Sequence, residues 1–141
     1  MTAHRFPYVQ VDPSLGDASA LPYMPITLTN GQQKIGASAL VHSGAALNVL
    51  PYNLGIQLGV VWEQQTVPVA LSGNLAASEA RALLLTGQVA DFPPVRLAFA
   101  WSRSNNVPVI LGQVNFFMNF DVCFFRAQLL YEIRRAGSTE D

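Results

Sequence analysis

Charged side chains are scarce in this chain of 141 residues, of which they make up only 12%. Eight basic and nine acidic residues leave a formal net charge of -1, so no excess of positive charge favours nucleic acid or another polyanion. Long apolar runs are also lacking. No stretch approaches the roughly 18 apolar residues of a membrane-spanning helix, and the N-terminus lacks the pattern of a secretory signal. We therefore expect a soluble, cytoplasmic protein without nucleic-acid or membrane partners.

Cysteine is nearly absent, because Cys123 is the only one in the sequence. A single cysteine excludes an intrachain disulfide and is compatible with a reducing compartment. We interpret Cys123 as a small buried hydrophobe between Val122 and Phe124. Internal repeats, low-complexity tracts and interdomain linkers are lacking as well. With 50% hydrophobic residues at this length, the sequence predicts one domain over residues 21–135, with an irregular arm at 1–20 and a disordered tail at 136–141.

Short stretches that alternate like β-strands, separated by turn signals, dominate the sequence. Asn30-Gly31 is a strong two-residue hairpin signal between two of them. Residues 52–59 predict a short helix that ends at Gly59, and residues 112–118 predict a helical turn. Strands are expected at 8–11, 25–29, 32–41, 48–51, 67–71, 76–86, 89–92, 95–100, 107–111, 120–125 and 128–133. This pattern predicts an all-β domain that forms a closed β-barrel with one or two short helices.

Two motifs carry a family resemblance. Residues 40–45 read Leu-Val-His-Ser-Gly-Ala at the end of a predicted strand, and residues 110–112 read Ile-Leu-Gly. In order and spacing they resemble the active-site loop and the C-terminal motif of the retropepsin-like aspartic proteases, whose loop has Asp where this chain has His42. A predicted hairpin with Gly73 at its tip lies between them, where those proteases have the flap that closes over bound peptide. The resemblance implies a barrel of the retropepsin-like acid protease type over about residues 24–133.

By this resemblance, the active site needs two copies of the chain. The family's reaction uses two carboxylates that share one proton and activate a water molecule, and each chain contributes one carboxylate. The resemblance therefore implies a homodimer with the active site at the two-fold axis and a peptide or protein substrate. It assigns catalytic positions to His42, Ser43 and Gly44, substrate-binding positions to Ala45, Leu71, Ser72, Gly73, Asn74, Leu75, Val109 and Ile110, and structural positions to Leu111 and Gly112.

His42 in both subunits would replace the carboxylate pair by two imidazoles. At about pH 5 each imidazole tends to protonate and two close cations repel, so neither protonation state replaces the dyad. We therefore expect an aspartic endopeptidase that is nearly inactive in this form. The alternative is a natural pseudoprotease that binds peptides or proteins as a dimer. Engineering and natural degeneration both stay open as origins of His42, and the otherwise intact motifs favour engineering.

Other chemistries find less support in these residues. A nucleophilic Ser43 with His42 as its base is not expected, because adjacent residues on a tight turn rarely face each other and no acidic residue follows. The resemblance instead gives the Ser43 hydroxyl a hydrogen bond across the two-fold axis. Two His42 side chains offer only two metal ligands, fewer than zinc sites usually have, so we expect no metal and no cofactor. Trp62 and Trp101 are interpreted as core residues rather than as peptide-stacking surfaces.

Overall fold

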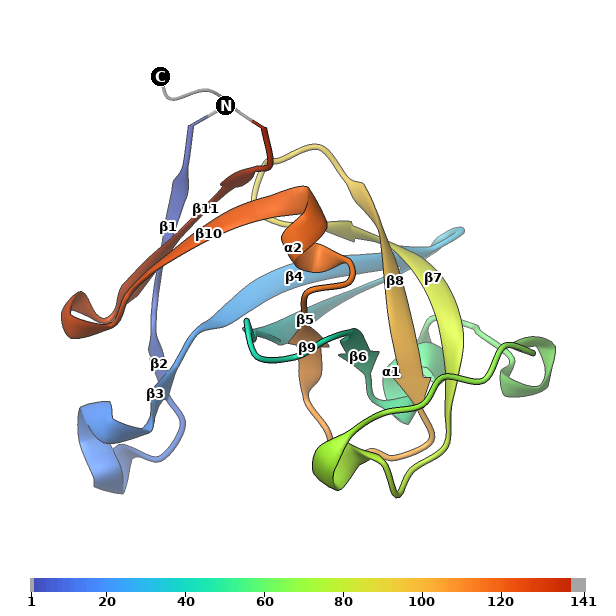
Figure 1. The fold of residues 1–141 in the computed structure, drawn as a ribbon. Helices are drawn as coiled ribbons and strands as arrows, with labels where there is room; N and C mark the ends of the chain where they lie inside the picture. The colour runs from blue at the N-terminus through green and yellow to red at the C-terminus, as the bar shows by residue number, and fades with distance from the viewer. Residues whose placement is uncertain (1, 138–141) are drawn as a thin grey trace.

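Six strands of the computed structural model, which describes residues 2–137, close into a barrel in the order β4-β5-β9-β6-β8-β7 (Figure 1). The helices in the described part of the chain are short, namely α1 (Tyr52–Gln57), α2 (Phe116–Asn119) and several 3₁₀ turns. The predicted all-β closed barrel with one or two short helices is therefore confirmed. The barrel strands are β4 (Tyr23–Asn30), β5 (Gln33–Val41), β6 (Asn48–Leu50), β7 (Ala80–Gln88), β8 (Val95–Ser102) and β9 (Val109–Leu111).

Alternation along the strands builds the core of the barrel. On β4, the side chains of Met24, Ile26 and Leu28 are buried, and the residues between them are more exposed. The predicted hairpin joins β4 to β5, with Gly31 at the left-handed φ of 59° that glycine adopts without strain. Trp62 and Trp101 are 2% and 0% exposed, which confirms that they belong to the core. The other large, fully buried aromatic residues are Phe92, Phe99, Phe116, Phe120 and Tyr131.

A second sheet lies beside the barrel and combines both ends of the chain (Figure 1). Its order is β1-β11-β10, and a smaller pair of strands, β2 and β3, lies nearby. The strand predicted at 8–11 is present in part as residues 9–10, which pair with β3. Residues 4–7, which we expected to be irregular, are also a strand, because β1 pairs along β11 at the far end of the sequence. Local patterns cannot reveal such a partner. The bounds are β1 (His4–Pro7), β2 (Val9–Gln10), β3 (Ala20–Leu21), β10 (Phe120–Phe125) and β11 (Leu130–Arg135), with a 3₁₀ segment at Pro13–Ser19.

Two predicted strands are replaced by other structure. Residues 67–71 contribute only an isolated bridge between Pro68 and Arg81, and β7 begins at Ala80 rather than at 76. The intervening segment contains a 3₁₀ turn at Gly73–Leu75. Residues 89–92 form a turn, in which Ala90 has a positive φ of 48° and Phe92 is buried. At residues 67–71 the apolar sequence did not indicate burial, because these residues are exposed or half-buried. At 89–92 it did, since Val89 and Phe92 are buried in a turn rather than in a strand.

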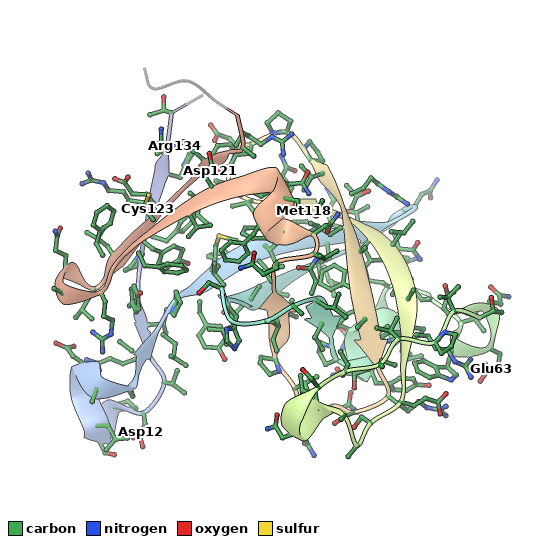
Figure 2. The ribbon with its side chains drawn as sticks, in the orientation of Figure 1. Asp12, Glu63, Met118, Asp121, Cys123 and Arg134 are labelled. Atoms are coloured by element: carbon green, nitrogen blue, oxygen red, sulfur yellow. The ribbon has the colours of Figure 1, made fainter. Side chains whose placement is uncertain are left out.

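Cys123 was expected to be buried, and this expectation is wrong. It lies on β10, which is the last strand of the second sheet, and its side chain is exposed (Figure 2). Residues 123–125 at the end of this strand are all exposed, so apolar character there does not indicate the core. Residues 138–141 of the predicted tail lie outside the described range. Within residues 2–137, no helix is long and apolar enough to cross a membrane.

Candidate functional site

The loop that follows β5 is positioned by β9, which lies between β5 and β6 in the barrel. β5 and β9 run parallel, with Leu40 opposite Ile110. β6 meets β9 in the antiparallel sense, with Val49 opposite Ile110. Residues 42–47 must therefore pass around the end of β9. The backbone amide of His42 begins this crossing and donates a hydrogen bond to the carbonyl oxygen of Leu111 at 2.9 Å.

Gly112 stands where the loop and β9 approach most closely. A Cβ atom added at this position would lie 2.5 Å from the carbonyl oxygen of Leu47 and 2.7 Å from that of Ala45, so only glycine fits. Directly after it, the amide of Gln113 donates to the carbonyl of Ala45 at 2.9 Å, and the Gln113 side chain donates to the carbonyl of Ser43 at 2.8 Å. The two sequence motifs are thus in direct contact.

Asn48 supports the same crossing from inside the protein, where it is fully buried. Its Oδ1 accepts a hydrogen bond from the amide of Gly112 at 2.8 Å, and its Nδ2 donates to the carbonyl of Ala98 and to Oδ1 of Asn115, both at 3.0 Å. Our sequence analysis did not identify Asn48. The available signal was an amide side chain within the apolar run 45–50, because a polar group buried there must find partners.

His42 is exposed and its ring is oriented by its own loop. Its Nδ1 accepts a hydrogen bond from the amide of Gly44 at 3.2 Å, which assigns the proton of the neutral ring to Nε2. The amide of Ala45 donates to the carbonyl of His42 at 3.1 Å and closes the turn. The imidazole therefore accepts from the Gly44 amide as a carboxylate oxygen could.

A cavity of about 500 Å³ opens beside His42. One part of its wall comes from the loop and the barrel, and the other part comes from the first half of residues 70–79, which we call the flap segment. Apart from His42, Ser72 and Asn74, the lining is apolar or glycine. The lining residues are His42, Gly44, Ala45, Ala46, Leu47, Val49, Ile110, Ala70, Leu71, Ser72, Asn74 and Leu75.

The cavity brings together most of the predicted site residues, but not all of them. Val109, Leu111 and Gly112 are buried in the barrel and do not line it, and Gly73 lies in the flap turn outside the lining. Ser43 borders a smaller hollow of about 310 Å³, which His42 also lines. Tyr8, Leu21, Pro22, Leu40, Val41 and Phe124 complete the lining of that hollow. Ala46, Leu47, Val49 and Ala70 line the main cavity without having been predicted, and only their proximity to the motifs could have indicated them.

Acidic side chains are absent from the described lining of the main cavity. The carboxylate of Asp91 lies 2.7 Å from Nε2 of His4. Figure 2 shows Asp12, Glu63 and Asp121 at well-separated edges of the molecule. Among residues 2–137, no three side chains of His, Cys, Asp or Glu come together as a metal site. Residues 2–137 of one copy therefore offer no carboxylate pair beside His42.

Comparison with known proteins identifies a similar fold. The sequence matches no protein-family model and no curated protein. Among solved structures, a retropepsin-like aspartic protease from Rickettsia conorii is similar, with a TM-score of 0.62 over 94% of this chain and 98% of that chain. The two sequences are 12% identical, so the likeness is one of fold. It confirms the predicted retropepsin-like type of barrel.

Proposed function

We propose that this chain is an aspartic endopeptidase of the retropepsin-like homodimeric type, and that His42 at the catalytic position leaves it nearly inactive. One observation carries the proposal. The loop that begins at His42 is held against β9 at Gly112 and opens onto a cavity that the flap segment borders from the other side. A peptidase site of this type needs these parts together, namely a catalytic loop, a supporting strand and a cover over an extended peptide.

An aspartate at position 42 would supply the missing chemistry. In a two-fold dimer the two carboxylates would face each other and share one proton, because two close negative charges repel. The ionised carboxylate would take a proton from a water molecule as the water oxygen attacks the peptide carbonyl carbon. The protonated carboxyl would donate its proton to the carbonyl oxygen. The tetrahedral intermediate would then break its C–N bond. The carboxyl that took the water proton would pass it to the leaving amine, and the other carboxylate would take a proton from a hydroxyl group of the intermediate.

Histidine at position 42 cannot perform these two roles as a pair. The Nδ1 atom of His42 already accepts from the Gly44 amide, and Nε2 carries the proton of the neutral ring, so neither nitrogen has a free lone pair to take a proton from a water molecule. In acid both rings of a dimer would tend to carry charge and repel each other. Loss of catalytic groups commonly costs several orders of magnitude in rate, so we expect almost no hydrolysis.

The substrate that the cavity favours is an extended peptide with apolar side chains beside the cleaved bond. Ala45, Val49, Leu71, Leu75 and Ile110 supply apolar surface in the lining, and such surface favours apolar side chains. The flap segment would add backbone hydrogen bonds to a peptide that lies alongside it like a strand.

A second copy of the chain is the partner in this proposal. Each copy contributes one His42 loop, so the site is complete only at a two-fold axis. The smaller hollow beside Ser43 supports this arrangement, because it places apolar surface from Leu21 and Phe124 next to the loop. Both side chains are partly exposed, at 40% and 37%.

A dimeric pseudoprotease that binds peptides without cleaving them is the second candidate. The observation that favours it is the hydrogen bond from the Gly44 amide to Nδ1 of His42. Histidine thereby fits the loop as an acceptor. A loop that accommodates histidine in this way is compatible with a chain that has lost hydrolysis and kept its cleft.

The substitution His42→Asp separates the two candidates. A mixed peptide library is incubated with the parent chain, with His42→Asp and with His42→Asn as a matched control, from about pH 3 to 7, and light scattering measures the molecular mass. The Asn variant is close to Asp in size and has no carboxylate. We expect cleavage only by the Asp variant and only in acid. If the His42→Asp variant forms dimers that stay inactive, this result would contradict the endopeptidase and support the pseudoprotease.

A further inference from the structure

The flap segment is closed at its base by two backbone hydrogen bonds. The amide of Val69 donates to the carbonyl of Ala80 at 3.0 Å, and the amide of Ala82 donates to the carbonyl of Val67 at 2.8 Å. Inside the segment the backbone hydrogen bonds are local, from the amide of Ala76 to Gly73 and from that of Ser78 to Leu75. The distance between this segment and the rest of the His42 cavity wall therefore depends on the contacts at the base of the segment.

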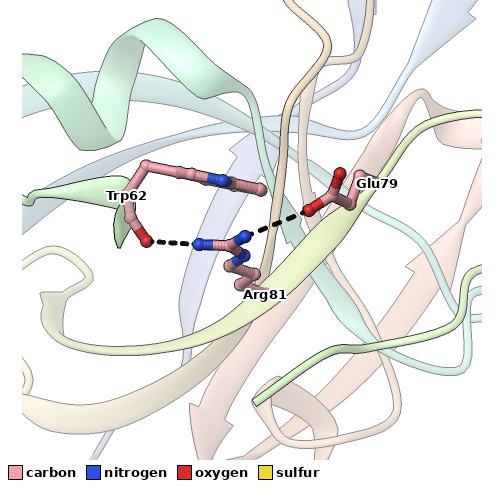
Figure 3. A network of polar contacts seen from close by, with 3 residues as sticks. All are labelled: Trp62, Glu79 and Arg81. Atoms are coloured by element: carbon pink, nitrogen blue, oxygen red, sulfur yellow. Dashed lines mark hydrogen bonds and ion pairs between the residues drawn. The ribbon is translucent and has the colours of Figure 1, made fainter. Parts of the chain in front are cut away.

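Arg81, on β7, connects that base to the core residue Trp62 (Figure 3). Its Nη1 donates to the carbonyl oxygen of Trp62 at 2.8 Å, and its Nη2 lies 3.3 Å from Oε2 of Glu79, the last residue of the flap segment. The guanidinium also stacks on the indole ring of Trp62, 4.5 Å from the ring centroid. One side chain thus joins the end of the flap segment to a residue of the core.

The residue to which Arg81 is bound, Trp62, is buried among other aromatic rings. Trp62 is 2% exposed and packs edge-to-face against Trp101 at 5.1 Å and against Tyr52 at 5.8 Å. Arg103 contacts the same indole at 5.0 Å, and its amide donates to the carbonyl of Glu79 at 2.8 Å. Glu79 is therefore held twice, through its side chain by Arg81 and through its backbone by Arg103.

We propose that Arg81 is a positioning residue for peptide binding, which sets the flap segment over the cavity by holding Glu79 to Trp62. This inference rests on the proposed function only in that the flap segment covers bound peptide. Arg81 does not line the cavity and touches no reacting atom. A planar guanidinium can donate to the carbonyl, pair with the carboxylate and stack on the ring at the same time, whereas a lysine ammonium cannot.

Amide hydrogen exchange tests the anchor without any substrate. NMR follows the amides of Val69 and Ala82 at the base, with the amide of His42 as a reference elsewhere in the barrel. We expect Arg81→Gln to accelerate exchange of the two base amides by about tenfold and to leave the reference unchanged. In Arg81→Lys, the exchange rates of these two amides should lie between those of the parent and those of Arg81→Gln. Arg96→Gln is the matched control, because Arg96 is on β8 at the other end of the β7–β8 pair and its side chain makes a long 3.5 Å contact with Thr86.

Kinetics in the His42→Asp background test the link to peptide binding. We expect Arg81→Gln to raise KM by roughly 5- to 20-fold while kcat changes by less than about twofold, because the reacting groups are untouched. A purely structural role would lower the yield of folded enzyme and would not alter KM selectively. Arg81→Lys should raise KM less than Arg81→Gln does.

The outcomes separate this inference from the proposed function. Unchanged exchange at Val69 and Ala82, or equal acceleration of all three amides, would overturn the role of Arg81 whether or not the Asp variant cleaves peptides. An equal fall in kcat and kcat/KM would also overturn it. An inactive Asp variant contradicts the proposed endopeptidase, and the exchange result still decides the anchor. If Arg81→Gln does not fold, Glu79→Gln removes the same ion pair and must accelerate the same two amides.

Discussion

At the scale of single residues, Gly112 limits how the His42 loop can cross β9. A methyl group there would meet the carbonyl oxygens of Leu47 and Ala45 at 2.5 and 2.7 Å, and backbone atoms cannot rotate away as a side chain can. We expect Gly112→Ala to lower the free energy of unfolding by at least about 2 kcal/mol, measured by urea unfolding. Gly36→Ala on β5 is the control, because its added Cβ meets nothing within 4 Å. Equal losses from both substitutions would contradict the crowding argument.

Asn48 is the second residue on which the crossing depends. Replacement by alanine would leave the amide of Gly112, the carbonyl of Ala98 and the side chain of Asn115 each without one partner inside the protein. We expect Asn48→Ala to lower the free energy of unfolding by about 2–5 kcal/mol, because buried polar groups lose their hydrogen bonds.

Chemical denaturation at pH 7 measures the effect of Asn48→Ala. Asn106→Ala is the matched control, since Asn106 is an exposed loop residue and should lose less than about 0.5 kcal/mol. A loss as small as that of the control would show that water or a shifted loop satisfies the three groups left by Asn48.

These residues also show what the sequence could reveal about the site. The motifs at 40–45 and 110–112 could be identified because they resemble those of the retropepsin-like aspartic proteases, and the structure brings the two segments into direct contact. The role of Asn48 could not be read in the same way. Its partners come from β8, from the residue directly after β9 and from the residue before α2, and only the folded chain brings them together.

At the scale of secondary structure, Tyr131 joins the second sheet to the barrel. It is fully buried on β11, and its hydroxyl donates to the carbonyl of Tyr23 on β4 at 2.8 Å. Phe6 stacks on its ring at 5.6 Å from the opposite end of the chain. Burial, with a smaller contribution from Tyr8, raises the pKa of Tyr131 well above its usual value of 10.0.

This raised pKa predicts how stability depends on pH. The folded state keeps Tyr131 protonated, while the unfolded chain releases its proton above about pH 10. The stabilising contribution is therefore complete below about pH 10 and is lost as the pH rises from there toward the folded pKa. We expect unfolding free energies measured from about pH 8 to 11 to fall at the upper end of this range. The free energy of unfolding of Tyr131→Phe should fall less steeply in that range, and at pH 7 it should be about 1 kcal/mol lower than that of the parent chain. Parallel curves for the two proteins would contradict this assignment.

The strands themselves were predictable to different degrees. The β4–β5 hairpin was found because alternation and Asn30-Gly31 are local signals. β1 was missed because its partner β11 lies more than a hundred residues away, as the Arg5–Glu132 ion pair at 2.7 Å illustrates. Residues 67–71 looked like a strand, but the segment ends in a loop whose base is held by the side chain of Arg81 rather than by a long ladder.

At the scale of the whole molecule, exposed apolar residues gather on the part that holds the second sheet and its neighbouring strands. Phe124 and Phe125 are 37% and 38% exposed at the end of β10, and Val9 and Leu21 on β2 and β3 are 45% and 40% exposed. β10 is also the last strand of its sheet, so one of its edges is open to pairing. An exposed apolar area beside an open strand edge is typical of a surface that another protein chain covers.

The proposed homodimer predicts that this surface holds the two copies together. Phe124 lies next to Ser43 in the hollow beside the His42 loop, so a charge there would be buried without a partner in the dimer. We expect Phe124→Asp to weaken dimerisation about 100-fold, as loss of a buried aromatic anchor commonly does. Light scattering over a range of protein concentrations measures it, and circular dichroism checks the fold.

In the His42→Asp background, specific activity should then rise with protein concentration, because only the dimer has both carboxylates. Leu84→Asp is the control, since Leu84 on β7 is 56% exposed and does not line the hollow. Equal weakening by both substitutions, or an active monomer, would show that the copies meet elsewhere or that one copy suffices.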